Sequence, residues 1–130
     1  MASDQLENSI ITRLIDGNGY LMSPDATYYV SLHTADPGDT GTNELPSTNG
    51  YARKSYTTSG GWNAASGGST SNNGSITFAA ASGGDWATAT HFGVWNNSAG
   101  TSANFMLGGA LTSSVTCTDG DAVQFLGGTP

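Results

Sequence analysis

Charged residues are scarce in this sequence. Asp, Glu, Lys and Arg together make up 10% of its 130 residues, and the cations are limited to Arg13, Arg53 and Lys54. Ten acidic residues outnumber them, which gives a net charge of −7 at pH 7. Three cations cannot neutralise a run of phosphates, so the composition argues against nucleic-acid binding. An anionic membrane surface repels such an acidic chain for the same reason.

Cysteine and long apolar runs are equally scarce. Cys117 stands alone and cannot close a disulfide within the chain, as expected for assembly in a reducing cytoplasm. The first residues, 1–4, lack the basic and apolar segments of a signal peptide, and no apolar run approaches the ~20 residues that span a bilayer. We therefore expect a soluble protein without a membrane anchor.

The chain has few of the residues and motifs that nucleophilic catalysis requires. His33 and His91 are its histidines, and both fall on expected strands. A nucleophile needs an adjacent base that is itself oriented, and neither a G-x-S-x-G turn nor a phosphate-binding glycine loop with its lysine is present. A hydrogen-bonded strand histidine is the favoured interpretation of each, over a catalytic one. We expect no enzyme activity, no cofactor and no small-molecule substrate.

Metal ligands are also poorly assembled. Asp36, Asp39 and Glu44 lie on one loop, where carboxylates can hold Ca²⁺, but their spacing does not follow the EF-hand order. A solvated acidic loop is the favoured interpretation. One cysteine and two distant histidines do not make a zinc site. We expect no metal centre.

What the sequence does contain is typical of a folded β-domain rich in turns: 19 glycines, three Trp, five Tyr and four Phe. Apolar residues at helical spacing predict one helix over about 4–16, capped at its start by Ser3 or Asp4. This short helix must dock to persist, either as a lid on its own domain or against a partner.

After Gly17 the apolar period changes to two, which indicates strands. Tyr28, Val30 and Leu32 are expected to face the core from the first of them. The ranges 34–50 and 57–74 are expected to be long loops. We predict an all-β fold in a single domain over 1–130, an antiparallel β-sandwich or jelly-roll-like domain with one short N-terminal helix. The expected strands cover about 27–33, 51–56, 75–79, 88–95, 104–111, 113–117 and 122–126.

Arg53 stands out because the chain almost lacks cations. It follows Tyr51 at the start of an expected strand, beside the acidic loop 34–50. We predict that its planar guanidinium is held by a carboxylate or by carbonyls of that loop, with Asp36 as the best single candidate. A contact with a partner protein is the alternative.

Three stretches together resemble a family of small virion structural proteins of tailed bacteriophages. They are Tyr29-Val30-Ser31-Leu32-His33-Thr34-Ala35-Asp36-Pro37, Asn49-Gly50-Tyr51-Ala52-Arg53 and Thr90-His91-Phe92-Gly93-Val94-Trp95. The resemblance covers roughly residues 6–125. Its members are described as capsid decoration (cement) proteins, including those of cyanophages, or as tail-fibre and tail proteins.

The resemblance implies a β-sandwich or jelly-roll-like fold and a homotrimer on the outside of the capsid, bound to the major capsid protein and assembled in the host cytoplasm. It brings no catalytic residues. It leaves His33, Asp36, Tyr51, Arg53, His91 and Trp95 as candidates for structural or interaction roles. The similar proteins often add an apolar strand after the Asp-Gly-Asp turn, so a closing strand that is shorter here or completed by a neighbour is expected.

Capsid decoration is thus the first functional hypothesis. A tail, tail-fibre or host-receptor-binding protein is the second, and a carbohydrate-active enzyme the third.

Overall fold

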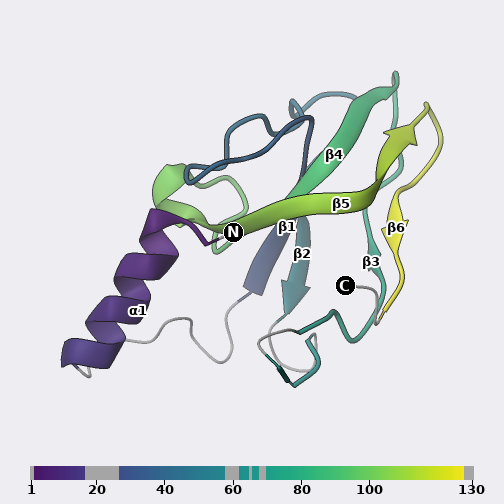
Figure 1. Cartoon of the computed structure of the whole chain (residues 1–130). Helices are drawn as coiled ribbons and strands as arrows, with labels where there is room; N and C mark the ends of the chain where they lie inside the picture. Colours follow the sequence, from purple (N-terminus) through teal and green to yellow (C-terminus); the bar gives the residue numbers. More distant parts are fainter. Residues whose placement is uncertain (1, 17–26, 58–61, 65, 68–69, 128–130) are drawn as a thin grey trace.

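Two antiparallel sheets make up the computed structural model, which describes residues 2–16, 27–57, 62–64, 66–67 and 70–127. The larger sheet has the strand order β2-β1-β4-β5, and the smaller one pairs β3 with β6 (Figure 1). Their bounds are β1 Thr27–His33, β2 Lys54–Thr57, β3 Ile76–Thr77, β4 Trp86–Trp95, β5 Phe105–Cys117 and β6 Gln124–Phe125. The helix α1 spans Asp4–Asp16, and the 3₁₀ turn η1 spans Ser102–Asn104. The predicted all-β class with antiparallel sheets in a sandwich-like arrangement and one N-terminal helix is confirmed.

The strand bounds follow the sequence pattern most closely where apolar and polar residues alternate. β1 covers the predicted 27–33, whereas β2, β3 and β6 are shorter than predicted. The separate strands predicted at 104–111 and 113–117 are wrong, because both lie in the single strand β5. Residues 111–114 of β5 lie opposite Thr90 alone in the β4–β5 pairing. The strand therefore continues through a bulge, where the sequence was interpreted as a break.

The main core lies between the two sheets. Val30 and Leu32 of β1 are 4% and 1% exposed and pack in one cluster with Ile76, Phe78 and Val123 of the facing layer. Tyr28, the third inward-facing residue predicted for β1, is also buried. Burial of these side chains supplies the main stabilisation of the fold.

The opposite face of the larger sheet is buried as well. Ser31 and His33, predicted on the outer face of β1, are both 0% exposed. The segment after β1 turns back over them, because His33 Nδ1 lies 2.7 Å from the Thr42 carbonyl and Gly41 packs against Trp95. The segment then pairs with the edge of β1, where Leu45 N–H donates to the Leu32 carbonyl at 3.0 Å. The C-terminal end of β1 is therefore covered on both faces.

The helix α1 is fixed at its start. Ser3 is 0% exposed, and its hydroxyl donates to the Phe105 carbonyl at 2.6 Å and accepts from Leu6 N–H at 3.3 Å. Ser3 N–H also donates to the Met106 carbonyl, so the cap residue is tied to β5. From there α1 extends away from both sheets (Figure 1).

The hypothesis that α1 packs as a lid on its own domain disagrees with the exposure of its described apolar side chains. Ile10 and Ile11 of α1 are 37% and 59% exposed. Among the described residues no helix has the length and apolar character needed to cross a membrane.

Candidate functional site

Four of the predicted interaction candidates converge at one place. Arg53, His33 and Trp95 lie on the outer face of the larger sheet, whereas the ring of Tyr51 lies in the core between the sheets and its hydroxyl reaches the partner of Arg53. We call these residues, with Ser31 and Glu44, the Arg53 cluster. The guanidinium carbon of Arg53 lies 3.5 Å from the centroid of a Trp95 ring, and the imidazole of His33 stacks against Trp95 at 6.4 Å with 7° between the ring planes. The cluster thus combines a cation with aromatic faces in a mostly buried setting.

Arg53 joins three segments of the chain. Its Nε and Nη2 donate to the carboxylate of Glu44, the latter at 2.8 Å, and its Nη1 donates to the carbonyl of Asn97 at 3.0 Å. Nη2 also reaches the carbonyl of Gly100 at 3.3 Å. The side chain of Arg53 is 9% exposed and that of Glu44 is 21% exposed. A bidentate ion pair sheltered to this degree is stronger than a typical surface pair.

Tyr51 binds the same Glu44 carboxylate as Arg53. Its hydroxyl donates to Glu44 Oε1 at 3.1 Å and accepts from the backbone N–H of Leu32 at 2.9 Å. Burial, together with the nearby negative charge of Glu44, raises the pKa of Tyr51 well above its ordinary value. The phenol therefore stays protonated and remains a donor to Glu44.

A chain of hydrogen bonds runs beneath Trp95. Trp95 Nε1 donates to Ser31 Oγ at 2.7 Å, Ser31 Oγ lies 2.7 Å from His33 Nε2, and His33 Nδ1 lies 2.7 Å from the carbonyl of Thr42. A carbonyl can only accept, so Nδ1 carries a proton and the Ser31 hydroxyl donates to Nε2. Burial lowers the pKa of His33, which keeps the imidazole neutral in this arrangement.

Two glycines make room for this packing. A Cβ on Gly93 would lie 2.7 Å from Ser31 Oγ and 2.8 Å from His33 Nε2. Gly41 has a φ of +73° and approaches the Trp95 ring so closely that a side chain there would overlap it. The loop 34–50 therefore lies directly on the aromatic part of the Arg53 cluster.

Asp36 is not the partner of Arg53, and that prediction is wrong. The acceptor is Glu44, from the same loop. Asp36 Oδ1 instead accepts the N–H of Gly38 at 2.9 Å, a local turn bond that satisfies the carboxylate close to its own backbone. The prediction of a loop carboxylate is met by Glu44. The carbonyls that accept from Arg53 belong to residues 97 and 100, which lie outside the loop.

His91 lies outside the Arg53 cluster. It pairs with His33 across β1 and β4, is partly exposed, and its Nδ1 lies 2.8 Å from the hydroxyl of Thr90. In the part of the chain that the structure describes, no group of three or more His, Cys, Asp or Glu side chains could hold a metal ion.

Sequence reasoning missed Ser31 and Glu44. Ser31 looks like an exposed residue of an alternating strand, and no local pattern reveals that a loop covers it. For Glu44 a weak signal existed, because it directly precedes Leu45, an apolar residue that is 3% exposed. An acidic residue next to a buried anchor in a loop is well placed for a fixed ion pair.

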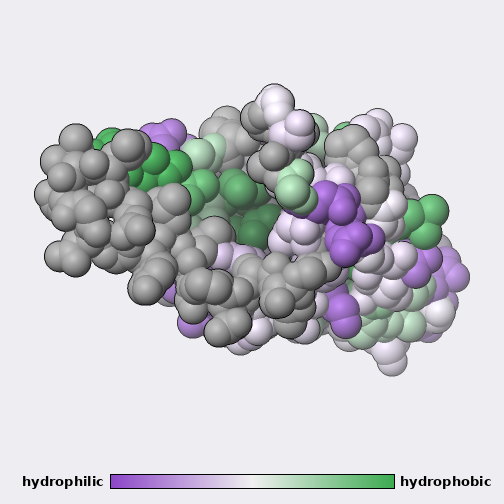
Figure 2. Space-filling model, turned by 90° about the horizontal axis from the view of Figure 1, so that it is seen from below, coloured by the Kyte–Doolittle hydropathy of each residue, from purple (hydrophilic) through white to green (hydrophobic). Residues whose placement is uncertain are grey.

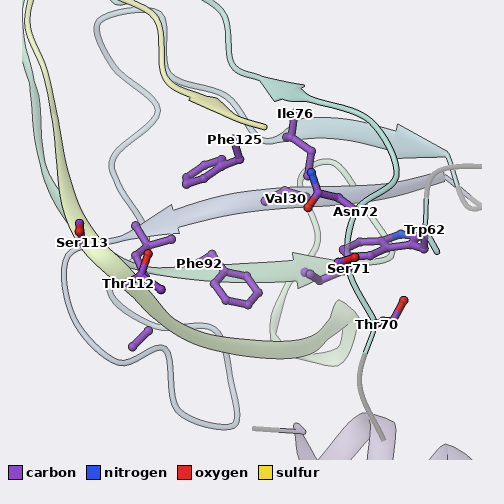
Figure 3. Close-up of a pocket in the computed structure, with 13 residues that line it drawn as sticks. Val30, Trp62, Thr70, Ser71, Asn72, Ile76, Phe92, Thr112, Ser113 and Phe125 are labelled. Atoms are coloured by element: carbon purple, nitrogen blue, oxygen red, sulfur yellow. The ribbon is translucent and has the colours of Figure 1, made fainter. Parts of the chain in front are cut away.

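A second feature is an apolar groove between the two sheets, with a volume of about 200 Å³. Figure 3 shows Ile76 and Phe125 pointing from the smaller sheet toward Val30 and Phe92 of the larger one. We call this the inter-sheet groove. Val94 of β4, residues 110–113 of β5, the polar side chains of 70–72 and Trp62 complete its lining. No charged residue is among the described residues that line it.

Comparison with known proteins identifies the family of this chain. The model of the family described as podophage GP4 fiber I protein gp80 matches residues 1–129. None of the curated proteins matches the chain. The predicted relation to phage virion structural proteins is confirmed. The match supports a relation to fibre proteins over one to capsid decoration proteins. With its sandwich-like β-fold and a match over nearly its whole length, this chain belongs to the podophage GP4 fiber I protein gp80 family.

Proposed function

We propose that this chain is a non-enzymatic structural subunit of a phage tail fibre and that it works as a homotrimer. The observation that carries the proposal is the match of a fibre protein family to residues 1–129. It supports the second functional hypothesis, the tail or tail fibre, over capsid decoration on the major capsid protein.

The Arg53 cluster supports a structural role. It brings a hydroxyl and an imidazole together as a nucleophile and base would be, but Ser31 and His33 are each 0% exposed. The hydroxyl also receives the Trp95 N–H, and the imidazole is fixed by a backbone carbonyl. A substrate has no access to such a pair, so its role is to fix the loop 34–50 on the sheet.

Charge supports a protein partner. A net charge of −7 with three cations disfavours nucleic acid and anionic membranes as partners. Copies of the chain itself are the simplest partner, because closed symmetry is the usual state of soluble homo-oligomers. The loop 34–50 needs no neighbouring copy to hold it, since its contacts lie within one chain.

The location of the protein on purified virions tests this function. Gold-labelled antibodies against the chain should decorate the tail, and quantitative gels should give a copy number in a low ratio to the major capsid protein. Labelling spread over the head, with copies in proportion to the capsid subunits, would refute the tail-fibre role and return capsid decoration to first place.

Catalysis is tested separately. Purified protein should release no product from ester, peptide, phosphate or glycan substrates. An activity that is lost in His33→Ala or His91→Ala while the fold is retained would refute the structural role.

A further inference from the structure

Two apolar surfaces of the described chain remain without a cover, and they lie on the same face. Figure 2 shows hydrophobic residues that run from the side of α1 into a hollow at the middle of this face. The helix contributes Ile10 and Ile11, at 37% and 59% exposed. The inter-sheet groove contributes the hollow, with Val30, Phe92 and Phe125 in its lining. One surface is convex and the other is concave.

The helix needs a partner for its stability. An isolated helix of 13 residues is marginal in water, and α1 is tied to the sheet through Ser3 at its start. Its apolar stripe must be covered for the rest of the helix to persist. Ile11, the more exposed of the two isoleucines, lies two turns beyond that attachment.

The inter-sheet groove is suited to apolar side chains of this size. Its volume of about 200 Å³ exceeds the ~150 Å³ of an apolar cavity that holds a benzene molecule. Its described lining carries no charge, and neither do Ile10 and Ile11. Two copies with a net charge of −7 each repel one another, and that repulsion is weakest where uncharged surfaces meet.

We propose that α1 of one copy packs its isoleucines into the inter-sheet groove of a neighbouring copy, and that this contact holds the homotrimer together. The inference rests on the proposed function, because it names the interface of that oligomer. Each copy then donates one helix and accepts one, so every copy makes the same two contacts. Such a head-to-tail arrangement closes into a ring of three when successive copies are related by a threefold rotation.

Matched charge substitutions on the helix test the donor side. Ile11→Asp places a carboxylate on the exposed apolar stripe, whereas Asn8→Asp adds the same charge at an exposed polar position of the same helix. By light scattering after size-exclusion chromatography, Ile11→Asp should raise the dissociation constant by about tenfold or more, since an unpaired carboxylate is costly to bury. Asn8→Asp should remain trimeric. Circular dichroism checks that both variants fold.

A second pair tests the acceptor side. Ala110 is exposed and lines the groove, while Ser114 is exposed on the same strand and is not among the lining residues. Ala110→Asp should weaken the oligomer as Ile11→Asp does, and Ser114→Asp should not. A wild type that is monomeric at high concentration, or oligomers indifferent to both Ile11→Asp and Ala110→Asp, would overturn the inference.

Cross-linking identifies the contact directly. Ile11→Cys and Ala110→Cys proteins, mixed and oxidised, should give a disulfide-linked pair that contains one of each, while the native Cys117 stays buried. A disulfide within one chain that carries both changes, or a disulfide between two helices only, would overturn the helix-to-groove contact. In a chain that carries both changes, oxidation should link three copies into a closed ring, whereas two copies linked twice would uphold the helix-to-groove contact and refute the trimer. Tail labelling of virions stays independent of all these results.

Discussion

Replacing Arg53 by lysine tests whether the Arg53 cluster holds the outer loops to the sheet. The guanidinium donates to both oxygens of Glu44 and to the carbonyls of 97 and 100, and it lies over the Trp95 ring. An ammonium group keeps the charge but cannot bridge these acceptors at once. The variant should therefore leave some of them without a donor.

The magnitude follows from what is lost. A net hydrogen bond is worth about 1 kcal/mol, and the contact over Trp95 adds about 0.5–1 kcal/mol at a partly exposed site. Lysine retains one contact to Glu44, so we expect a loss of about 2 kcal/mol. For a chain of this size that lowers Tm by roughly 6–10 °C.

Thermal unfolding followed by circular dichroism measures the effect. Lys54→Arg, the reverse exchange at the next residue, is the matched control and should leave Tm nearly unchanged. Adding Glu44→Gln to Arg53→Lys should cost less than the sum of the single changes, because the two side chains share one interaction. An Arg53→Lys protein with the wild-type Tm would refute the reasoning.

The remaining predictions concern buried residues. The pKa of His33 is lowered by burial, so the unfolded chain takes up the proton first: the stabilisation is complete above pH ~6.5 and is lost as pH falls toward the folded pKa. Tm should drop between pH 7.5 and 5; a flat profile would contradict a buried neutral imidazole. Gly93→Ala forces a Cβ against Ser31 and should cost about 1–3 kcal/mol in urea unfolding, with a negligible change counting against the tight packing. Ser3→Ala removes both a helix cap and the bond to β5, and should cost about 1–2 kcal/mol and increase amide exchange in α1; unchanged exchange would disprove the attachment.

Local patterns in the sequence were sufficient for the elements themselves. The apolar spacing of the first residues predicted the helix 4–16, and the alternation from Tyr28 to Leu32 predicted β1 with its inward face. Both signals depend on neighbours within one turn or one strand. The bulge in β5 lies outside such patterns, because it is defined only by the pairing with β4.

The partners within the Arg53 cluster required contacts between distant segments. Asp36 and Glu44 lie on the same loop, and Asp36 was preferred as the acceptor from the sequence. Asp36, however, closes a turn onto Gly38, and the bridge between His33 and Glu44 carries the second carboxylate to Arg53. Alternation puts Ser31 on the face of β1 opposite Val30 and Leu32, and nothing in the local pattern shows that this face is buried too and that Ser31 is hydrogen-bonded there.

The attachment of α1 to β5 also determines how the protein would respond to a pull. Part of a force on the helix reaches the sheet through Ser3, whose bonds join it to Phe105 and Met106 at the very start of β5. From there the force acts along the length of β5, a 13-residue strand that is paired with β4 up to Cys117. In that direction the cross-strand hydrogen bonds are strained together instead of opening one after another. A subunit tethered by α1 would therefore resist extension with its longest pair of strands.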